Sequence, residues 1–347
     1  MADPVYRILD ANLNRAGEAL RVVEDHCRFA LQNGELSKQL KDMRHELGGL
    51  AASLDYRRLL RARDVDGDPG TTCTTVSERT REGPEAVLAA NFRRLAEALR
   101  SLEETGKIVD PALAHRVESL RYRAYRIESD VENLSLRHAL ASASLMVILT
   151  RSQCKRTPAE VIDSAHATGA RLFQLREKLA DSRESDREMF ARLSASMAEL
   201  RAYSDVTVII NDRPDMALAL GGHGVHLGRD DLPVDVARRM LGTAALIGCS
   251  VRNADEVHAA SGADYVGAGA MFETATKANT SLGGPEWGRT ATLLSALPVF
   301  CIGGIKTDNA PLLASAGVKR VAVGSGICGS MDPGAAVQEL LRVFPPL

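Results

Sequence analysis

Residues 174–178, Gln-Leu-Arg-Glu-Lys, combine one amide with two cations at the end of a mostly apolar run that begins at Ala170. In a β-strand alternate side chains share a face, so Gln174, Arg176 and Lys178 would point to one side. An amide and two cations at one spot suit a polyanion such as a diphosphate. The simpler alternative is a charged strand end in water. Because polar groups follow the later strands as well, we favour anion binding and predict Arg176 and Lys178 as catalytic.

Carboxylates follow the next two apolar runs along the chain. Asp212 ends one run, and Asp230 and Asp231 come directly after the other. Carboxylates at neighbouring strand ends can share Mg2+, which binds one or two protein carboxylates and completes its shell with water and substrate phosphate. The alternative is that these aspartates cap helices, one opening at Pro214 and one after Leu232. Beside a diphosphate site we favour the metal, and we predict Mg2+ as the cofactor.

Two glycine-containing turns, Gly303-Gly304 and Gly324-Ser325, follow the last two predicted strands. Glycine lets backbone N–H groups approach ligand oxygens, and barrels of alternating strands and helices often bind a phosphomonoester at this place. The alternative is a pair of tight strand-to-helix turns. We predict a phosphate site there.

A long loop contains Thr274, Thr276 and Lys277, and loops of that length are often functional. Lys277 is either a solvated lysine or a cation that reaches a phosphate, and we predict the second role, as a catalytic residue. His226 alternates with Val225 and Leu227, and we predict a structural barrel histidine in preference to a catalytic base.

The elements that must position these residues begin after residue 140, where short apolar strands alternate with helical stretches. Eight such units in about 200 residues predict an α/β fold with a (β/α)8 (TIM) barrel, in which polar strand ends meet at one mouth. An open doubly wound sheet would also alternate, but no G-x-G-x-x-G follows the first strand. The expected strands are 145–150, 170–176, 207–212, 224–228, 246–251, 265–270, 299–305 and 320–326. Helices are expected to begin near Pro158, Ser185, Pro214, Pro233, Asn253, Pro285, Asp308 and Asp332.

The first part of the chain reads as helix almost throughout and contains an internal repeat. Residues 12–24 resemble residues 91–103, with Arg and Glu at matching positions three residues apart. A second basic helix follows each copy, so we predict duplicated helical hairpins in one bundle. The expected domains are an all-α domain at 1–138 and the barrel at 139–347. The Asp-rich loop at 63–70 lacks the distal glutamate of a calcium loop, so we favour a plain loop there.

Composition argues against several other classes of protein. A net charge of -2 and 4% aromatic residues give no basis for binding nucleic acid or a membrane. The six cysteines form no C-x-x-C pair and fit free thiols in a reducing cytosol. We expect a cytoplasmic location because neither a secretory signal nor a membrane-length apolar run is visible. The sequence does not indicate an oligomeric state.

Several motifs occur in the order and at nearly the spacing of one known family. They are QLREK at 174–178, INDR at 210–213, GVHLG at 224–228 with Asp231, GCS at 248–250, GADYVG at 262–267, TATK at 274–277, IGGI at 302–305 and VGS at 323–325. This set, which spans nearly all of residues 143–347, resembles thiamine phosphate synthases. Those enzymes join 4-amino-2-methyl-5-(diphosphooxymethyl)pyrimidine to 4-methyl-5-(2-phosphooxyethyl)thiazole and release diphosphate in thiamine biosynthesis.

The resemblance implies a role for each matching residue. The pyrimidine diphosphate would be held by Gln174, Arg176, Lys178, Asn211, Ser250 and Lys277. The thiazole phosphate would be held by Thr274, Thr276, Gly304, Gly324 and Ser325, and Mg2+ by Asp212 and Asp231. The predicted substrate-binding stretches also include the intervening Leu175, Glu177 and Ala275. The chain departs from the family at Ala270 and Glu273, where proline is frequent, and at Gly324, where a branched apolar residue is usual.

The residue chemistry agrees with that reaction. Expelling diphosphate builds negative charge that cations and Mg2+ can stabilise, and the aminopyrimidine can delocalise the positive charge left behind. The thiazole nitrogen then attacks, so no protein nucleophile is needed. The alternatives are a barrel relative that isomerises thiazole phosphate and a non-catalytic phosphate-binding regulator. An isomerase-like relative would be expected to lack the cation cluster and the metal carboxylates.

The helical half resembles a domain fused to some thiamine phosphate synthases and described as an alternative hydroxymethylpyrimidine phosphate kinase. The resemblance rests on residues 7–25 and the loop at 63–71. No glycine-rich phosphate loop is visible in this half. Its charged stripes therefore leave three hypotheses open: a kinase, a docking surface and a structural domain.

Overall fold

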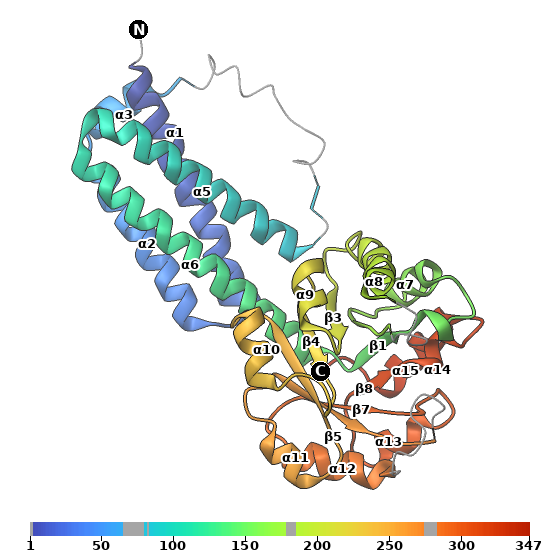
Figure 1. The fold of residues 1–347 in the computed structure, drawn as a ribbon. Helices are drawn as coiled ribbons and strands as arrows, with labels where there is room; N and C mark the ends of the chain where they lie inside the picture. The colour runs from blue at the N-terminus through green and yellow to red at the C-terminus, as the bar shows by residue number, and fades with distance from the viewer. Residues whose placement is uncertain (1–2, 65–79, 82, 178–184, 274–282) are drawn as a thin grey trace. The chain divides into compact units, whose positions relative to one another are not determined.

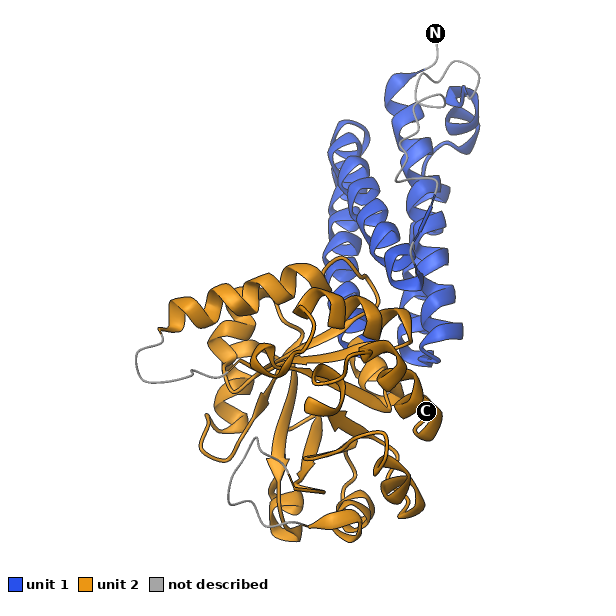
Figure 2. Cartoon of the chain, turned by 90° about the vertical axis from the view of Figure 1, so that its right-hand side faces the viewer, with its two compact units in different colours: residues 1–135 blue, residues 136–347 orange. Residues whose placement is uncertain are grey.

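The structure is a computed structural model that describes residues 3–64, 80–81, 83–177, 185–273 and 283–347. Figure 2 colours its two compact units, residues 1–135 and 136–347. The boundary predicted at 138/139 lies beside this division, in the same long helix. Each unit has its own hydrophobic core.

The described part of the first unit is helical, as the sequence predicted (Figure 1). Its elements are α1 (Pro4–Asp25), the π-helix η1 (His26–Ala30), α2 (Gly34–Ser53), α3 (Tyr56–Ala62), α5 (Pro84–Val109) and α6 (Pro111–Ser142), which continues past residue 135. Asp3 caps α1 by accepting from the N–H groups of Val5 and Tyr6. Apolar residues at helical spacing, such as Leu95, Leu99 and Leu102 of α5, are fully buried in the core of this unit.

The two copies of the sequence repeat make equivalent buried ion pairs. Glu24 at the end of α1 accepts from Arg44 Nε of α2 at 3.1 Å, and Glu103 of α5 accepts from Arg121 Nε of α6 at 2.8 Å. Both glutamates are only 4% exposed. Part of the repeated charge stripe therefore joins each repeat helix to the helix that follows it, which a solvated stripe would not do.

The second unit is a closed barrel of eight parallel strands in chain order, which confirms the predicted fold. The strands are β1 (Leu145–Leu149), β2 (Leu172–Leu175), β3 (Thr207–Asn211), β4 (Gly224–Leu227), β5 (Leu246–Val251), β6 (Tyr265–Gly269), β7 (Val299–Ile302) and β8 (Val321–Val323). Each lies within an expected strand.

The helices of this unit follow the strands. They are η3 (Arg151–Gln153), α7 (Pro158–Ala167), α8 (Asp186–Leu200), α9 (Pro214–Leu220), α10 (Val234–Leu241), α11 (Ala254–Ala259), α12 (Gly284–Leu294), α13 (Ala310–Ser315), α14 (Ser325–Cys328) and α15 (Pro333–Val343). Of these, η3 and α14 were not expected. Capping explains several starts, since Thr157 and Ser185 form capping boxes with Glu160 and Glu188.

Strand alternation divides the barrel residues into two sets. Outward residues such as Val147, Phe173 and Val225 pack against the surrounding helices in the larger core. Inward residues near the strand starts, such as Leu172 and Phe300, form a separate core inside the barrel. Most of the polar inward residues lie nearer the strand ends, so the largely apolar interior supports the site from below.

Leu140 closes the apolar interior beneath the strands. It lies in the last turns of α6, is 2% exposed and belongs to the interior core with Met146, Tyr265 and Phe300. Tyr265 fits because Gly248 has no Cβ; a Cβ there would lie 2.1 Å from Tyr265 Cζ. None of the helices that the structure describes has both the length and the apolar character that a bilayer crossing needs.

We expect Leu140→Ala to lower the free energy of unfolding of the barrel by about 2–5 kcal/mol, because it leaves a cavity among buried side chains. The exposed Leu218→Ala is the matched control and should change it by less than about 0.5 kcal/mol. Guanidinium denaturation followed by fluorescence reports on the barrel, because Trp287 is the only tryptophan in the chain. Equal stability of the two variants would show that Leu140 is not part of the core.

Candidate active site

A pocket opens at the carboxyl ends of the barrel strands and encloses about 1000 Å³, counting its solvent-open mouth. Its lining follows from alternation, because inward residues two apart on a strand continue into the pocket. Members of this inward set that line it are Ile148 and Thr150, Gln174 and Arg176, Asn211, His226 and Gly228, Ser250, Gly267 and Gly269, Ile302 and Gly304, and Ala322 and Gly324. The strand ends chosen from sequence therefore do meet at one mouth.

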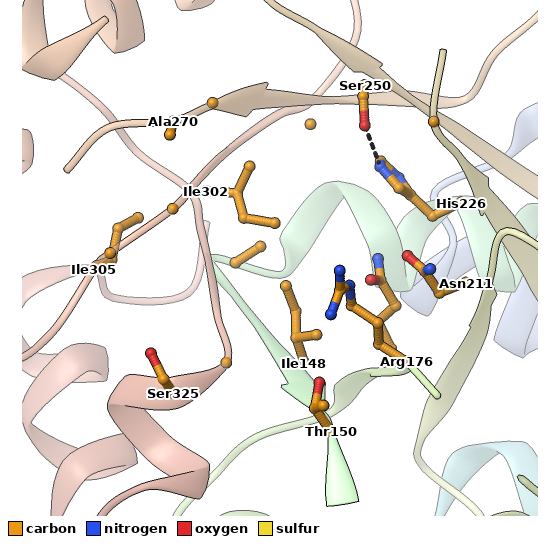
Figure 3. Close-up of a pocket in the computed structure, with 18 of the residues that line it drawn as sticks. Ile148, Thr150, Arg176, Asn211, His226, Ser250, Ala270, Ile302, Ile305 and Ser325 are labelled. Atoms are coloured by element: carbon orange, nitrogen blue, oxygen red, sulfur yellow. Dashed lines mark hydrogen bonds between the residues drawn. The ribbon is translucent and has the colours of Figure 1, made fainter. Parts of the chain in front are cut away.

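One side of the pocket is suited to an anion. Figure 3 shows Arg176 and Asn211 on the same side as His226, with Ser325 across the pocket. Burial lowers the pKa of Arg176, and the charge of Asp212 opposes that shift. Asn211 is 8% exposed, and its Nδ2 has no hydrogen-bond partner among the described residues. A desolvated cation beside an unpartnered buried donor is an environment that a bound anion would stabilise.

The two aspartates predicted as metal ligands do not cap helices. The residues that cap α9 and α10 are Arg213 and Pro233, neither of which makes a side-chain capping bond. Asp212 lines the pocket instead, and its φ of 64° lies in the left-handed region, which is uncommon outside glycine. Asp231 accepts through Oδ2 from the N–H of Gly228, a pocket-lining residue, at 2.6 Å.

This donor set fits a magnesium ion that substrate helps to hold. Asp212 offers carboxylate oxygens at the pocket, and Asp231 has one oxygen engaged by Gly228, which lines the pocket. In the part of the chain that the structure describes, no group of three or more His, Cys, Asp or Glu side chains could hold a metal by itself. Mg2+ tolerates so few protein ligands when phosphate and water complete its shell.

The opposite side of the pocket contains the glycine turns. Gly303 and Gly304 have φ values of 104° and 65°, and a Cβ on Gly304 would lie 2.4 Å from the carbonyl oxygen of Glu273. Asn309 holds this turn, since its Nδ2 donates to the Gly304 carbonyl at 2.9 Å. Gly324 precedes α14, so the first N–H groups of that helix lie beside the pocket. This arrangement suits a phosphate bound by backbone donors.

A hydrogen-bonded chain lies on the pocket floor. His226 is 7% exposed; its Nε2 lies 3.1 Å from Ser250 Oγ, as drawn in Figure 3, and its Nδ1 lies 3.2 Å from Tyr265 Oη. Burial raises the pKa of Tyr265, whereas a hydrogen bond from Gln174 acts in the opposite direction. Gly267 leaves room for the imidazole, since a Cβ there would lie 2.9 Å from His226 Cε1. The structural role predicted for His226 and its place in the pocket are therefore compatible.

Some predicted site residues lie elsewhere. Leu175 packs in the outer core, and the Glu177 carboxylate accepts from the Arg151 N–H and from Arg192 Nε, both at 3.2 Å. Alternation turns both side chains away from the pocket, so we assign Glu177 to bracing the end of β2 rather than to substrate contact. Five predicted residues lie outside the described residues: Lys178, Thr274, Ala275, Thr276 and Lys277.

Apart from His226, sequence reasoning missed three polar side chains that line the pocket. Thr150 and Gln153 follow β1, and Arg252 follows β5. Alternation from Ile148 would have found Thr150, but the residue is uncharged and drew no attention. Gln153 lies in the unexpected 3-10 helix η3, so no strand pattern pointed to it.

The chain matches two family models. The model described as Thiamine monophosphate synthase matches residues 145–327, and the ThiD2 family model matches residues 7–130. The thiamine-phosphate synthase of Nostoc punctiforme is 40% identical over 99% of this chain and 96% of that protein. That of Synechocystis sp. is 38% identical over 97% of this chain and 95% of that protein. Among solved structures, a thiamine phosphate pyrophosphorylase from Pyrococcus furiosus is 31% identical over 60% of this chain and 97% of its own, with a TM-score of 0.51.

We expect Gly304→Ala to destabilise the protein by about 1–3 kcal/mol or more. Alanine is strained in the left-handed backbone conformation, and its Cβ would also clash with the Glu273 carbonyl oxygen. Gly324→Ala is the matched control at the other turn. Its Cβ would lie 3.5 Å from the nearest atom, Ile148 O, an ordinary contact distance. Thermal unfolding of the two variants measures the difference, and an equal loss of stability at both turns would contradict this account.

Proposed function

Because the chain belongs to the thiamine monophosphate synthase family, we propose that its barrel mouth couples the aminopyrimidine diphosphate to the thiazole phosphate. The products are thiamine phosphate and diphosphate. The single observation that carries the site assignment is that one pocket joins the half-buried Arg176 and the buried Asn211 to the turns at Gly304 and Gly324. The reaction needs two anion sites in one cavity, one for each substrate.

The diphosphate lies on the Arg176 side in this proposal. The C–O bond to the pyrimidine methylene breaks, its electron pair leaves with diphosphate, and negative charge grows on the bridging oxygen. Arg176 stabilises that charge, and Asn211 Nδ2 donates to a phosphate oxygen. Both are in place before reaction, so little reorganisation is needed. Lys178 and Lys277 stay predicted as further cations of this cluster.

Asp212 and Asp231 are the residues that would hold Mg2+. When bound, the ion supplies additional positive charge that neutralises the leaving diphosphate. Asp212 lies close enough to Arg176 to influence its pKa, so its carboxylate also balances that buried cation. The left-handed backbone of Asp212 presents the carboxylate at the end of β3.

The thiazole phosphate lies on the opposite side. Backbone N–H groups at Gly304, Gly324 and Ser325 bind its phosphate, and Thr274 and Thr276 stay predicted as further contacts. The thiazole nitrogen donates its lone pair to the pyrimidine methylene and forms the C–N bond. No protein atom forms a covalent bond to substrate, so positioning both rings provides much of the acceleration.

The direct test incubates purified full-length protein with Mg2+ and both substrates and measures thiamine phosphate and diphosphate. One equivalent of each product per turnover is expected. A barrel that isomerises thiazole phosphate would consume that substrate without pyrimidine diphosphate, and a regulator would release neither product.

We expect Arg176→Ala to lower kcat by about 10²- to 10³-fold, because it removes a half-buried cation from the leaving group. Arg171→Ala is a matched control at the opposite end of the same strand, where Arg171 is exposed and pairs with Asp205. Steady-state kinetics with both substrates saturating should show normal turnover for that control. Normal turnover of Arg176→Ala would show that Arg176 has no role in the reaction.

We expect Asp212→Asn to raise the Mg2+ concentration for half-maximal rate at least about tenfold, because it removes a negative charge from the metal site. Asparagine is the suitable replacement, since it tolerates the left-handed conformation that alanine does not. Asp215→Asn, at an exposed position of α9, is the control and should keep the wild-type dependence. Chelation of Mg2+ with EDTA should abolish turnover of the wild type, and unchanged turnover there would sink the magnesium assignment.

A further inference from the structure

Thr150 lies directly after β1 and lines the pocket without a role in the reaction proposed above. It is the N-cap residue of η3, a place where a threonine hydroxyl commonly accepts a hydrogen bond from the first turn of the helix. Here the side chain makes no capping bond, and its hydroxyl has no partner elsewhere in the part of the chain that the structure describes. Thr150 is only 6% exposed, and Figure 3 shows its oxygen directed toward the pocket. A buried hydroxyl therefore faces the space for a ligand.

The strand register places Thr150 beside Arg176. Leu149 of β1 pairs with Leu175 of β2, and the Arg176 N–H donates to the Leu149 carbonyl at 2.9 Å. The ladder thus continues one step beyond the end of β2. Leu149 and Leu175 point outward into the core beneath the helices, so alternation turns both Thr150 and Arg176 into the barrel.

Asn211 extends this arrangement to a third strand. Leu175 of β2 also pairs with Ile210 of β3, so Asn211 lies level with Arg176 on the side away from β1. We call Thr150, Arg176 and Asn211 the donor row. It presents a hydroxyl, a guanidinium and an amide nitrogen, Asn211 Nδ2, that is buried without a partner among the described residues.

The donor row suits a ligand with negative oxygens on more than one centre. Next to the positive charge of Arg176, the Thr150 hydroxyl is most stable with its oxygen toward the cation and its proton toward the ligand. Neighbouring strands lie about 4.8 Å apart, so the row spans about 10 Å of backbone, more than one phosphate group covers. A diphosphate, with oxygens on two phosphorus atoms, can accept from all three donors.

The second anion site also borders β1 but lies at another level of the strand. Val147 pairs with Val323 of β8, which brings Gly324 level with Ile148. The atom nearest to a Cβ on Gly324 would accordingly be the Ile148 carbonyl oxygen at 3.5 Å. Thr150 lies two residues further along β1, at the level of Arg176, so we assign it to the diphosphate.

The alternative is that water satisfies the Thr150 hydroxyl and the side chain only fills space. The local backbone favours the ligand, because it holds Thr150 in place. The Thr150 carbonyl accepts from the Gln153 N–H at 2.9 Å and from Cys154 Sγ at 3.3 Å. A donor held beside a half-buried cation is preorganised for an anion, which stabilises both groups more than neutral water does.

We propose that Thr150 is a further substrate-binding residue, whose hydroxyl donates to an oxygen of the pyrimidine diphosphate beside Arg176. The proposal rests on the proposed function, because it deepens the diphosphate side of the same pocket. Thr150 forms no covalent bond and moves no proton; it adds one donor to the site that receives the leaving group.

Thr150→Val tests this role, because it keeps the branched side chain and removes only the hydroxyl. In the full chain with Mg2+, we expect kcat/KM for the pyrimidine diphosphate to fall about tenfold to a hundredfold, since a hydrogen bond to a charged group is lost. KM for the thiazole phosphate should stay within about twofold of the wild type. Thr150→Ser, which retains the hydroxyl, should restore most of the loss. Thr207→Val is the matched control, since Thr207 is 5% exposed at the start of β3 and lies outside the pocket lining.

Binding of inorganic diphosphate gives a measurement without turnover. Calorimetric titration of the full chain with diphosphate and Mg2+ should give a Kd at least about tenfold higher for Thr150→Val than for the wild type. Thermal unfolding identifies a variant that does not fold, and Thr150→Ala then replaces it.

The outcomes separate this proposal from the proposed function. A folded Thr150→Val protein with wild-type kcat/KM and diphosphate binding contradicts the proposal, as does a defect confined to KM for the thiazole phosphate. If the wild type forms no thiamine phosphate, the proposed function fails instead. Diphosphate binding that still weakens on loss of the Thr150 hydroxyl would then support the binding role alone.

Discussion

The site depends on the parallel register that closes the barrel between β8 and β1. Each strand holds its own register with its neighbours, as Val147 of β1 does with Val323 of β8, and the registers together settle which side chains face inward. Arg176, Asn211 and Ser250 lie in the pocket for this reason alone. A slip of one residue in β2 would turn Leu175 and Glu177 toward the pocket. It would turn the Arg176 guanidinium outward, toward the surrounding helices. The register therefore determines the chemistry as well as the packing.

Within that frame, the pocket presents its polar groups before any ligand arrives. Arg176 has left water, which lowers its pKa, and Asn211 Nδ2 is buried without a partner among the described residues. Both arrangements cost stability in the free protein. An anion that binds there would offset part of this unfavourable free energy. In the proposed reaction, the negative charge that develops on the leaving diphosphate would offset more of it.

The sequence predicted the barrel well because its strands are apolar runs bounded by proline, glycine and polar residues. The same alternation brought Gln174, Arg176 and Asn211 to one mouth, as expected. It could not predict the chain through Tyr265, because contacts across a barrel depend on small residues such as Gly267 that make room. The left-handed backbone of Asp212 was equally invisible, since aspartate carries no signal for it.

Other parts of the site remain predictions. Lys178 and the loop at 274–277 lie outside the described residues, and the magnesium ligands rest on the donor set alone. In the helical half, the repeat was predicted from identical residues at matching positions. The structure adds that Glu24 and Glu103 of the repeat are buried. A kinase, a docking surface and a structural domain stay open as hypotheses for this half.

Glu24 and Glu103, which occupy matching positions of that repeat, differ in the number of cations that pair with them. Among the described residues Glu24 has one cationic partner, Arg44, whereas Glu103 has Arg121 and also Arg100 at 2.9 Å. Substitution of Arg44 would leave the buried carboxylate of Glu24 without a cationic partner among the described residues. Substitution of Arg121 would leave Glu103 paired with Arg100. The two copies of the repeat therefore differ in how much a single arginine substitution would destabilise the helical unit.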